Sequence, residues 1–101
     1  MNRARQIAAA LALAAAIALP AHADFDHAVA AFDKGDYAAA LRELQPLAAK
    51  GDARSQYAMG VMAENGFGMP KNLAQAATWY RKAAEQGNTD AQYNLGAMYQ
   101  H

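Results

Sequence analysis

The feature that most constrains the fold is an internal repeat with a period of 36 residues. A shift by this length superposes identical residues, namely Gly51 on Gly87, Gln56 on Gln92, Tyr57 on Tyr93, Gly60 on Gly96 and Met62 on Met98. A period in the mid-thirties is typical of helical hairpins that stack into a solenoid. The repeat therefore predicts an all-α chain in which Gly51–Gly87 forms one complete helix–turn–helix unit.

The amino terminus has the layout of a secretory signal peptide. Arg3 and Arg5 precede an unbroken apolar run, Ile7–Leu19, and the small residues Ala21 and Ala23 then occupy the −3 and −1 positions of a cleavage site. A transmembrane helix needs roughly 20 apolar residues, so the run is short for a stable anchor. We expect cleavage after Ala23 and, because the leader is rich in alanine, a periplasmic or secreted bacterial protein. The alternative is an uncleaved helix that tethers the chain to a membrane.

The composition of the remaining chain argues against several classes of function. There are no cysteines, so disulfides, thiolate chemistry and cysteine-based zinc sites are excluded. Without Arg3 and Arg5, nine acidic side chains outnumber seven basic ones. Nucleic acids bind to clustered Lys and Arg side chains, and no such cluster is present. We therefore expect no nucleic-acid partner.

Apolar spacings of three and four residues predict helices along the whole chain after the leader. The first spans about ten residues from Phe25, with Phe25, Val29 and Phe32 on one face, and ends at Gly35. The second is capped by Asp36 and ends at Gly51, with a kink or early loosening expected at Pro46.

Two further helices and part of another hairpin follow. The third helix is predicted over about 53–64 with Asp52 as its cap, and a glycine-rich turn over 65–71 leads to a fourth helix capped by Asn72. In the fourth helix the predicted buried stripe is Leu73, Ala76, Ala77, Tyr80, Ala83 and Ala84. The next copy starts at Asn88. The turn lacks the G-K-[ST] sequence of a phosphate-binding loop and follows no strand, which argues against phosphate binding.

Two glycines and three aromatic residues carry specific packing predictions. Glycine inside a helix costs about 1 kcal/mol relative to alanine, so Gly60 and Gly96 are predicted to admit a closely packed neighbouring helix. Trp79, Tyr80 and Tyr99 are predicted to pack in the core because they lie at helical spacing. The last helix lacks its own hairpin partner. We therefore expect either that the chain continues beyond His101 or that it pairs with another copy or a partner.

The complete unit resembles a Sel1-like repeat, a relative of the tetratricopeptide repeat. The resemblance rests on Met59-Gly60, on the turn Gly66-Phe67-Gly68-Met69, on the cap Asn72, and on Ala76, Trp79, Ala83-Ala84 and Gly87. Residues 90–99 resemble the first helix of another copy, and residues 25–51 resemble a tetratricopeptide repeat more loosely. The resulting organisation is a signal peptide (1–23), a tetratricopeptide-like hairpin (24–51), a complete Sel1-like repeat (52–87) and the first helix of an incomplete one (88–101). Ala63 departs from the usual Tyr.

The resemblance implies an α/α right-handed superhelix whose first helices line a concave face. Such proteins are adaptors and scaffolds that bind another protein or a peptide. The positions expected to face the concave groove are Arg54, Tyr57, Val61, Glu64, Asp90, Tyr93 and Ala97. A ladder of Tyr57 and Tyr93 suits peptide recognition, since tyrosine buries apolar area and keeps a hydroxyl for hydrogen bonding. The alternative is that both tyrosines pack between helices.

The residues needed for catalysis or metal binding are not grouped in the sequence. Ser55 is the only serine, and the histidines beyond the leader, His27 and His101, lie at opposite ends of the chain. No nucleophile–base pair or metal-ligand cluster follows from these spacings. We therefore predict a protein without catalytic residues, metal or cofactor. The alternative function is that of a Sel1-like protein that binds or hydrolyses cell-wall fragments.

Overall fold

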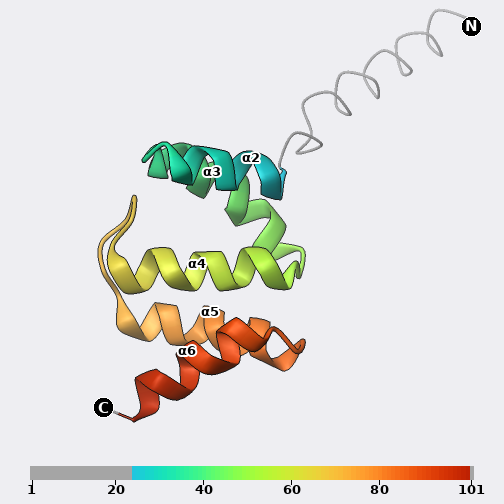
Figure 1. Ribbon diagram of the computed structural model, residues 1–101, viewed down its shortest axis with the longest axis vertical. Helices are drawn as coiled ribbons and strands as arrows, with labels where there is room; N and C mark the ends of the chain where they lie inside the picture. The colour runs from blue at the N-terminus through green and yellow to red at the C-terminus, as the bar shows by residue number, and fades with distance from the viewer. Residues whose placement is uncertain (1–23, 101) are drawn as a thin grey trace, which may run out of the picture.

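The computed structural model describes residues 24–100, which form a stack of five helices (Figure 1). The helices are α2 (Phe25–Asp33), α3 (Tyr37–Ala49), α4 (Ala53–Asn65), α5 (Leu73–Glu85) and α6 (Thr89–Tyr99). Within residues 24–100, no helix combines the length and apolar character needed to cross a membrane. The predicted signal peptide lies outside the described residues.

Each helix starts at a polar side chain that accepts a hydrogen bond from a backbone N–H of the first turn. The capping residues are Asp24, Asp36, Asp52, Asn72 and Asn88. These bonds satisfy donors that have no partner within the helix. The predicted caps Asp36, Asp52 and Asn72 are confirmed. Gly51 and Gly87 follow α3 and α5 with φ of 103° and 93°, so the 36-residue period extends to the backbone conformation.

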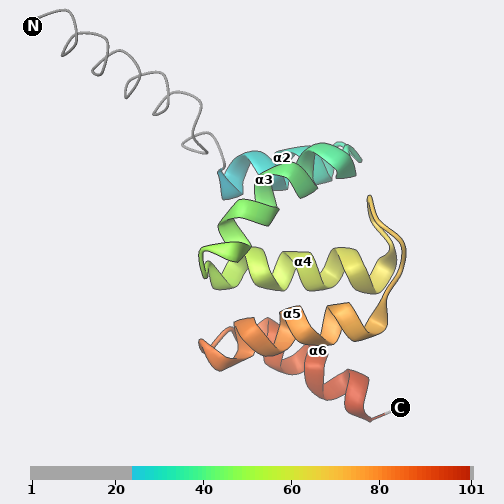
Figure 2. The same cartoon turned by 180° about the vertical axis from the view of Figure 1, so that it is seen from behind.

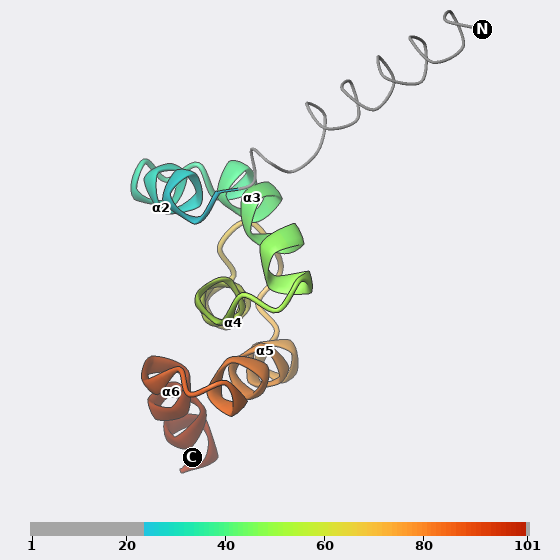
Figure 3. The ribbon, with the colours of Figure 1, turned by 90° about the vertical axis from the view of Figure 1, so that its right-hand side faces the viewer.

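The helices form two layers, as the end-on view in Figure 3 shows. Helices α2, α4 and α6 lie along one side, and α3 and α5 lie along the other. Each helix packs against the next one in the chain, and the α4–α5 pair makes the most extensive of these contacts. The predicted class, an all-α solenoid of helical hairpins, is confirmed.

Small residues and two methionines dominate the interior. One buried cluster joins the first hairpin to α4 and contains Ala28, Ala40, Leu44, Ala48, Met59 and Met62. A second joins α4, α5 and α6 and contains Ala63, Ala76, Tyr80, Ala83 and Ala91. Helix α4 contributes residues to both clusters and therefore connects the two halves of the stack.

Of the two alternatives predicted at Pro46, a kink or an early loosening, the structure shows the kink. Helix α3 continues to Ala49, and the N–H of Lys50 still bonds to the carbonyls of Pro46 and Leu47, so the last turn does not loosen. Figures 1 and 2 show α3 bending towards α4 in its second half, as expected where a proline lacks a backbone donor and crowds the preceding turn.

Two other expectations are wrong in detail. Leu73 is 50% exposed because it lies in the first turn of α5, and Tyr99 is 63% exposed because it lies in the last turn of α6, a helix that packs mainly against α5. Trp79 is half-buried and Tyr80 is fully buried, as predicted.

An aromatic cluster connects the turn after α4 to the first hairpin. In Figures 1 and 2 this turn extends from the end of α4 towards α2 and α3. The Phe67 ring stacks on Tyr37 with centroids 4.7 Å apart and meets Phe32 edge-on at 5.3 Å. Gly68 lies so close to Tyr37 that an added Cβ would be 3.0 Å from the Tyr37 Cβ. The glycine therefore lets the turn approach the hairpin.

Glutamine side chains join successive repeats in a recurring way. Gln56 Nε2 donates to the carbonyl of Ala48 at 3.2 Å, and Gln92 Nε2 donates to the carbonyl of Ala84 at 3.1 Å. The two bonds are related by the 36-residue shift. Gln86 Nε2 also donates to Gln56 Oε1 at 2.8 Å and to the carbonyl of Gly51 at 2.9 Å. These bonds fix how α4 and α6 sit on the helix that precedes each of them.

Candidate functional site

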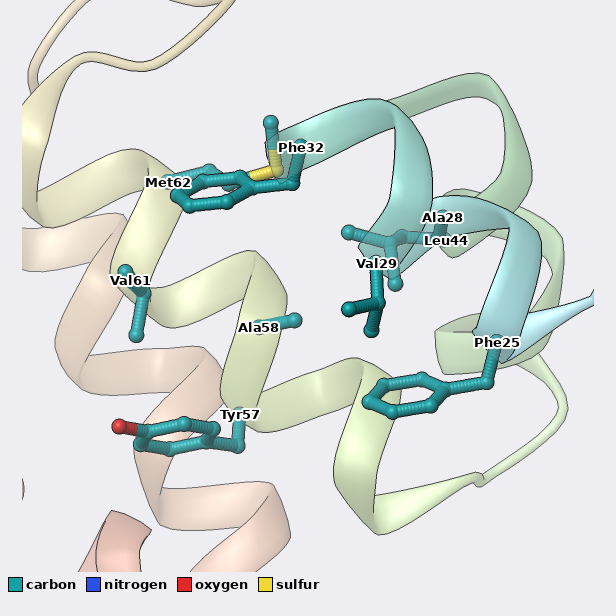
Figure 4. A pocket seen from close by; sticks show the side chains of 9 residues that line it. All are labelled: Phe25, Ala28, Val29, Phe32, Leu44, Tyr57, Ala58, Val61 and Met62. Carbon is teal, nitrogen blue, oxygen red and sulfur yellow. The ribbon is translucent and has the colours of Figure 1, made fainter. Parts of the chain in front are cut away.

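An apolar groove lies between α2 and α4 (Figure 4), two helices of the layer formed by α2, α4 and α6. Its volume is about 250 Å³. The nine side chains that line it are all apolar or aromatic and belong to α2, α3 and α4: Phe25, Ala28, Val29, Phe32, Leu44, Tyr57, Ala58, Val61 and Met62.

The α2 wall of the groove follows from the sequence pattern of that helix. Phe25, Val29 and Phe32 recur at helical spacing, and Ala28 beside them is buried against the rest of the first cluster. Small Ala28 lets α2 pack tightly, so the larger side chains turn towards α4. Figure 4 shows Phe25 and Phe32 at the two ends of this wall with Val29 between them. Val29 is 42% exposed, so the groove presents apolar surface to solvent.

The α4 wall rests on a buried tyrosine. Tyr57 is half-buried and its ring centroid lies 5.8 Å from that of Tyr80, which has no exposed surface. The Tyr80 hydroxyl donates to Glu64 Oε1 at 2.6 Å. Burial and this bond to the carboxylate raise the pKa of Tyr80, although a hydrogen bond with Asn94 opposes the shift. Tyr80 therefore stays a neutral donor that holds Glu64 in place.

A cation lies at the Phe25 end of the groove. Arg54 Cζ lies 4.4 Å from the centre of the Phe25 ring, and Arg54 Nη2 lies 3.3 Å from Asp52 Oδ2. Burial disfavours the charged form of Asp52, but hydrogen bonds from Arg54 and Ser55 outweigh it and lower the pKa of that carboxyl. Asp52 thus stays ionised and holds the guanidinium over the rim of the groove.

The structure brings together only part of the predicted site. Tyr57 and Val61 line the groove, Arg54 covers its rim, and Glu64 is bound to Tyr80. The predicted positions on α6 lie outside the groove lining: Asp90 is exposed, Ala97 is half-buried and Tyr93 is 77% exposed. Tyr57 and Tyr93 therefore occupy different environments, one packed and one solvated. Whether these residues contact a partner stays a prediction.

The contribution of α2 to the groove was not predicted from the sequence. Phe25, Val29 and Phe32 were recognised as one apolar face, but nothing in their spacing distinguishes a face that is covered from one that borders a groove. The position of these three residues on the first helix of a hairpin could have indicated that they line the groove, because the resemblance to a Sel1-like repeat implies that first helices line the concave face.

The described residues offer no arrangement for metal chemistry. Among residues 24–100, no three His, Cys, Asp or Glu side chains come close enough together to hold a metal ion. Every fully buried side-chain nitrogen or oxygen atom in this part of the chain has a hydrogen-bond partner. The polar groups of the core therefore serve the fold.

Comparison with known proteins places this architecture in a family. The Sel1 repeat family matches residues 53–88 and 89–101. Among curated proteins, the chitin synthase regulator SKT5 of Malassezia restricta is 39% identical over 51 residues, which is 50% of this chain and 4% of that protein. The DAP3-binding cell death enhancer 1 of Rattus norvegicus is 42% identical over 52 residues, which is 52% of this chain and 10% of that protein.

Chitin synthase regulatory factor 3 of Schizosaccharomyces pombe is 44% identical over 48 residues, which is 48% of this chain and 5% of that protein. The chain thus spans a small part of each of these relatives. The names of these proteins describe regulators and a binding protein. The matched residues cover α4, α5 and α6, the helices that contain the 36-residue repeat. Through residues 53–101, the chain belongs to the Sel1 repeat family.

Proposed function

We propose that this protein is an exported protein–protein interaction module whose α2–α4 groove binds an apolar segment of another protein. The observation that carries the proposal is the groove itself: a concave, almost entirely apolar lining with a partly exposed valine between two phenylalanines. Water-exposed apolar surface in a concave site favours binding, because its burial releases free energy in proportion to the area removed from water. Proteins of this family are generally adaptors, which agrees with this role.

The chemistry of the lining favours a peptide side chain over a small polar metabolite. Small-molecule sites combine an apolar cavity with a few convergent polar groups that fix orientation. Here the lining offers a single hydroxyl, that of Tyr57, and the nearest charge is Arg54 at the rim. One or two aliphatic or aromatic side chains of a partner would fill the groove. The backbone of the partner would then run past Tyr57 and Arg54.

Export is proposed from the leader sequence. A basic start, a short apolar core and small residues before Asp24 have the layout of a secretory signal peptide, which supports this part of the proposal. Mass spectrometry of the protein recovered from a bacterial periplasm or medium should give a chain that begins at Asp24. Recovery of the uncleaved chain from the membrane fraction would instead support the tether described above.

The groove is tested with a pair of matched substitutions. Peptides are selected from a random display library against the wild-type chain and then measured by fluorescence anisotropy. Val29→Asp places a charge in the groove at a partly exposed position, so it should weaken binding of the selected peptides at least tenfold while the chain stays folded. Leu73→Asp introduces the same charge at a similarly exposed leucine outside the groove and should leave binding unchanged.

Two results would contradict the proposal. If selected peptides bound Val29→Asp as tightly as the wild type, the groove would not be the binding surface. If the purified, folded chain hydrolysed cell-wall fragments, the enzyme alternative would replace the adaptor role. The proposal assigns the protein no catalytic residues and no cofactor.

A further inference from the structure

We propose that the partner segment bound by the α2–α4 groove is basic as well as apolar, with Lys or Arg side chains close to the residue that fills the groove. The carboxylates that receive these cations are Asp26 and Asp33 on α2 and Glu64 on α4, which we call the acidic rim. Because the groove is the proposed binding site, this assignment rests on the function proposed above and names the chemistry of the partner.

Two carboxylates of the acidic rim flank the groove on α2. Asp26 precedes the lining residue Val29 by three positions and Asp33 follows it by four, so all three lie on the same helix face. Both aspartates are exposed. They lie about 10 Å apart along the helix axis, within reach of two long basic side chains of one short segment. A segment that covers Val29 therefore passes close to a carboxylate on either side.

Glu64 adds a carboxylate on the α4 side of the groove. It follows the lining residue Val61 by three positions, so the two share a face of α4. Glu64 Oε1 accepts the hydrogen bond from Tyr80 that holds the side chain in place. Because both oxygens of a carboxylate accept hydrogen bonds, Glu64 can also receive a cation. Both walls of the groove thus border negative charge.

The acidic rim is not neutralised by the described part of the chain. Between residues 24 and 100, the one ion pair joins Arg54 to Asp52. No Lys, Arg or His side chain in this range lies within ion-pair distance of a rim carboxylate. The pair of Arg54 with Asp52 also balances the positive charge at the Phe25 end of the groove. The charge that remains around the groove is therefore negative.

The two layers of the fold differ in charge in the same sense (Figure 3). Helices α2, α4 and α6, the layer that contains the groove, carry four acidic residues and one basic residue: Asp26, Asp33, Glu64, Asp90 and Arg54. Helices α3 and α5 carry three basic residues and two acidic ones: Arg42, Arg81, Lys82, Glu43 and Glu85. Because surface charges act over about 8 Å at physiological ionic strength, a cationic segment is attracted to the layer that contains the groove.

Asp33 is the most informative residue of the acidic rim. It is the last residue of α2, and the helix dipole disfavours an anion in the last turn of a helix. Glu64 also lies in a last turn, that of α4, but its bond to Tyr80 compensates for this. No ion pair within residues 24–100 compensates Asp33. A cation of the partner supplies the missing compensation.

The experiment selects partners without prescribing their charge. A peptide display library with leucine or phenylalanine at its centre and random residues elsewhere is selected against the wild-type chain and sequenced. We expect Lys and Arg to be enriched near the central residue relative to the unselected library. The most frequent selected peptide is then measured by fluorescence anisotropy beside a copy in which Gln replaces every Lys and Arg. The copy should bind about fivefold more weakly.

A matched pair of charge reversals locates the effect. Asp33→Lys should weaken binding of the selected peptide about fivefold, because it removes a carboxylate and repels the cations of the peptide. Glu85→Lys makes the same change of net charge at the exposed last residue of α5, in the other layer, and should leave binding unchanged. Added salt should reduce the effect of Asp33→Lys. Val29→Asn removes apolar lining without adding charge, so it reports on the groove itself.

The outcomes separate this inference from the proposed function. Selection of basic peptides whose binding weakens with Asp33→Lys and with Val29→Asn, but not with Glu85→Lys, supports the inference. Neutral or acidic peptides that depend on Val29 overturn it and leave the groove as the binding site. Equal losses with Asp33→Lys and Glu85→Lys overturn it as well, because attraction to the net charge of the chain would then suffice. Basic peptides that bind Val29→Asn as tightly as the wild type, or a failure to select any peptide, contradict both proposals.

Discussion

Gly60→Ala should destabilise the protein, although alanine is the better helix former. Helix propensity alone favours the substitution by about 1 kcal/mol. The added methyl carbon would lie 2.5 Å from two carbons of the Tyr80 ring, whereas carbon atoms in contact normally lie about 3.5–4.0 Å apart. Tyr80 is fully buried and bonded to Glu64, so the ring cannot move without breaking that bond.

The expected magnitude follows from these contacts. Overpacking costs about 1–3 kcal/mol, and loss of a hydrogen bond to a charged group costs about 1.5–3 kcal/mol. After the helix-propensity gain of about 1 kcal/mol is deducted, the free energy of unfolding should fall by about 1.5–5 kcal/mol. A domain of this size has a total stability of about 4–11 kcal/mol, so the variant would lose a large share of it.

The assay is urea unfolding followed by far-ultraviolet circular dichroism, with Gly96→Ala as the matched control. Gly96→Ala should be neutral or stabilising by up to about 1 kcal/mol, because its methyl group meets nothing. A Gly60→Ala/Tyr80→Leu double variant should be more stable than the sum of the single changes predicts, since removal of the ring relieves the clash. If Gly60→Ala were as stable as the wild type, the argument for close packing of α5 on α4 would be refuted.

Three further predictions concern single side chains. Tyr80→Phe should reduce the loss of stability at alkaline pH. The raised pKa of Tyr80 in the folded state contributes stability that is fully present below the pKa of an unfolded tyrosine, about 10, and that is lost as the pH rises from there through the folded-state pKa. Thermal melts of both proteins between pH 8 and 11 test this. Asp52→Ala should cost about 1 kcal/mol at neutral pH through loss of the cap of α4, and the difference from the wild type should shrink as the pH falls through the lowered pKa of Asp52. Phe67→Ala should cost about 2 kcal/mol in urea unfolding, less than a fully buried phenylalanine, because the ring is half-buried but contacts two other rings.

The fold was largely predictable because the helix caps and the 36-residue repeat, both readable in the sequence, indicate the same arrangement of helices. Caps such as Asp52 and Asn72 are determined by residues within one turn, and the 36-residue repeat reports which helices share a role. Exposure at the end of the stack was not predictable in this way. Gly96 and Tyr99 have the sequence context of core positions, but burial depends on a neighbour that helical periodicity does not reveal.

The candidate site was predictable only on α4. The repeat relates first helices to one another, so it pointed to Tyr57 and Val61, which do line the groove. It also pointed to Tyr93 on α6, where the structure shows an exposed side chain. The first hairpin follows the 36-residue repeat too loosely for the residues of α2 to be aligned with those of α4. Phe25 and Val29 could therefore be identified only once the position of α2 against α4 was known.

The aromatic contact of Phe67 with Phe32 has a kinetic consequence for any ligand of the groove. Phe32 forms one end of the groove wall, and Phe67 ties it to the turn that follows α4, so the separation of the two walls is set before a partner arrives. A preformed groove loses little conformational entropy when it is occupied. Association should then be governed by encounter and orientation rather than by rearrangement, and partners should differ mainly in how long they stay bound.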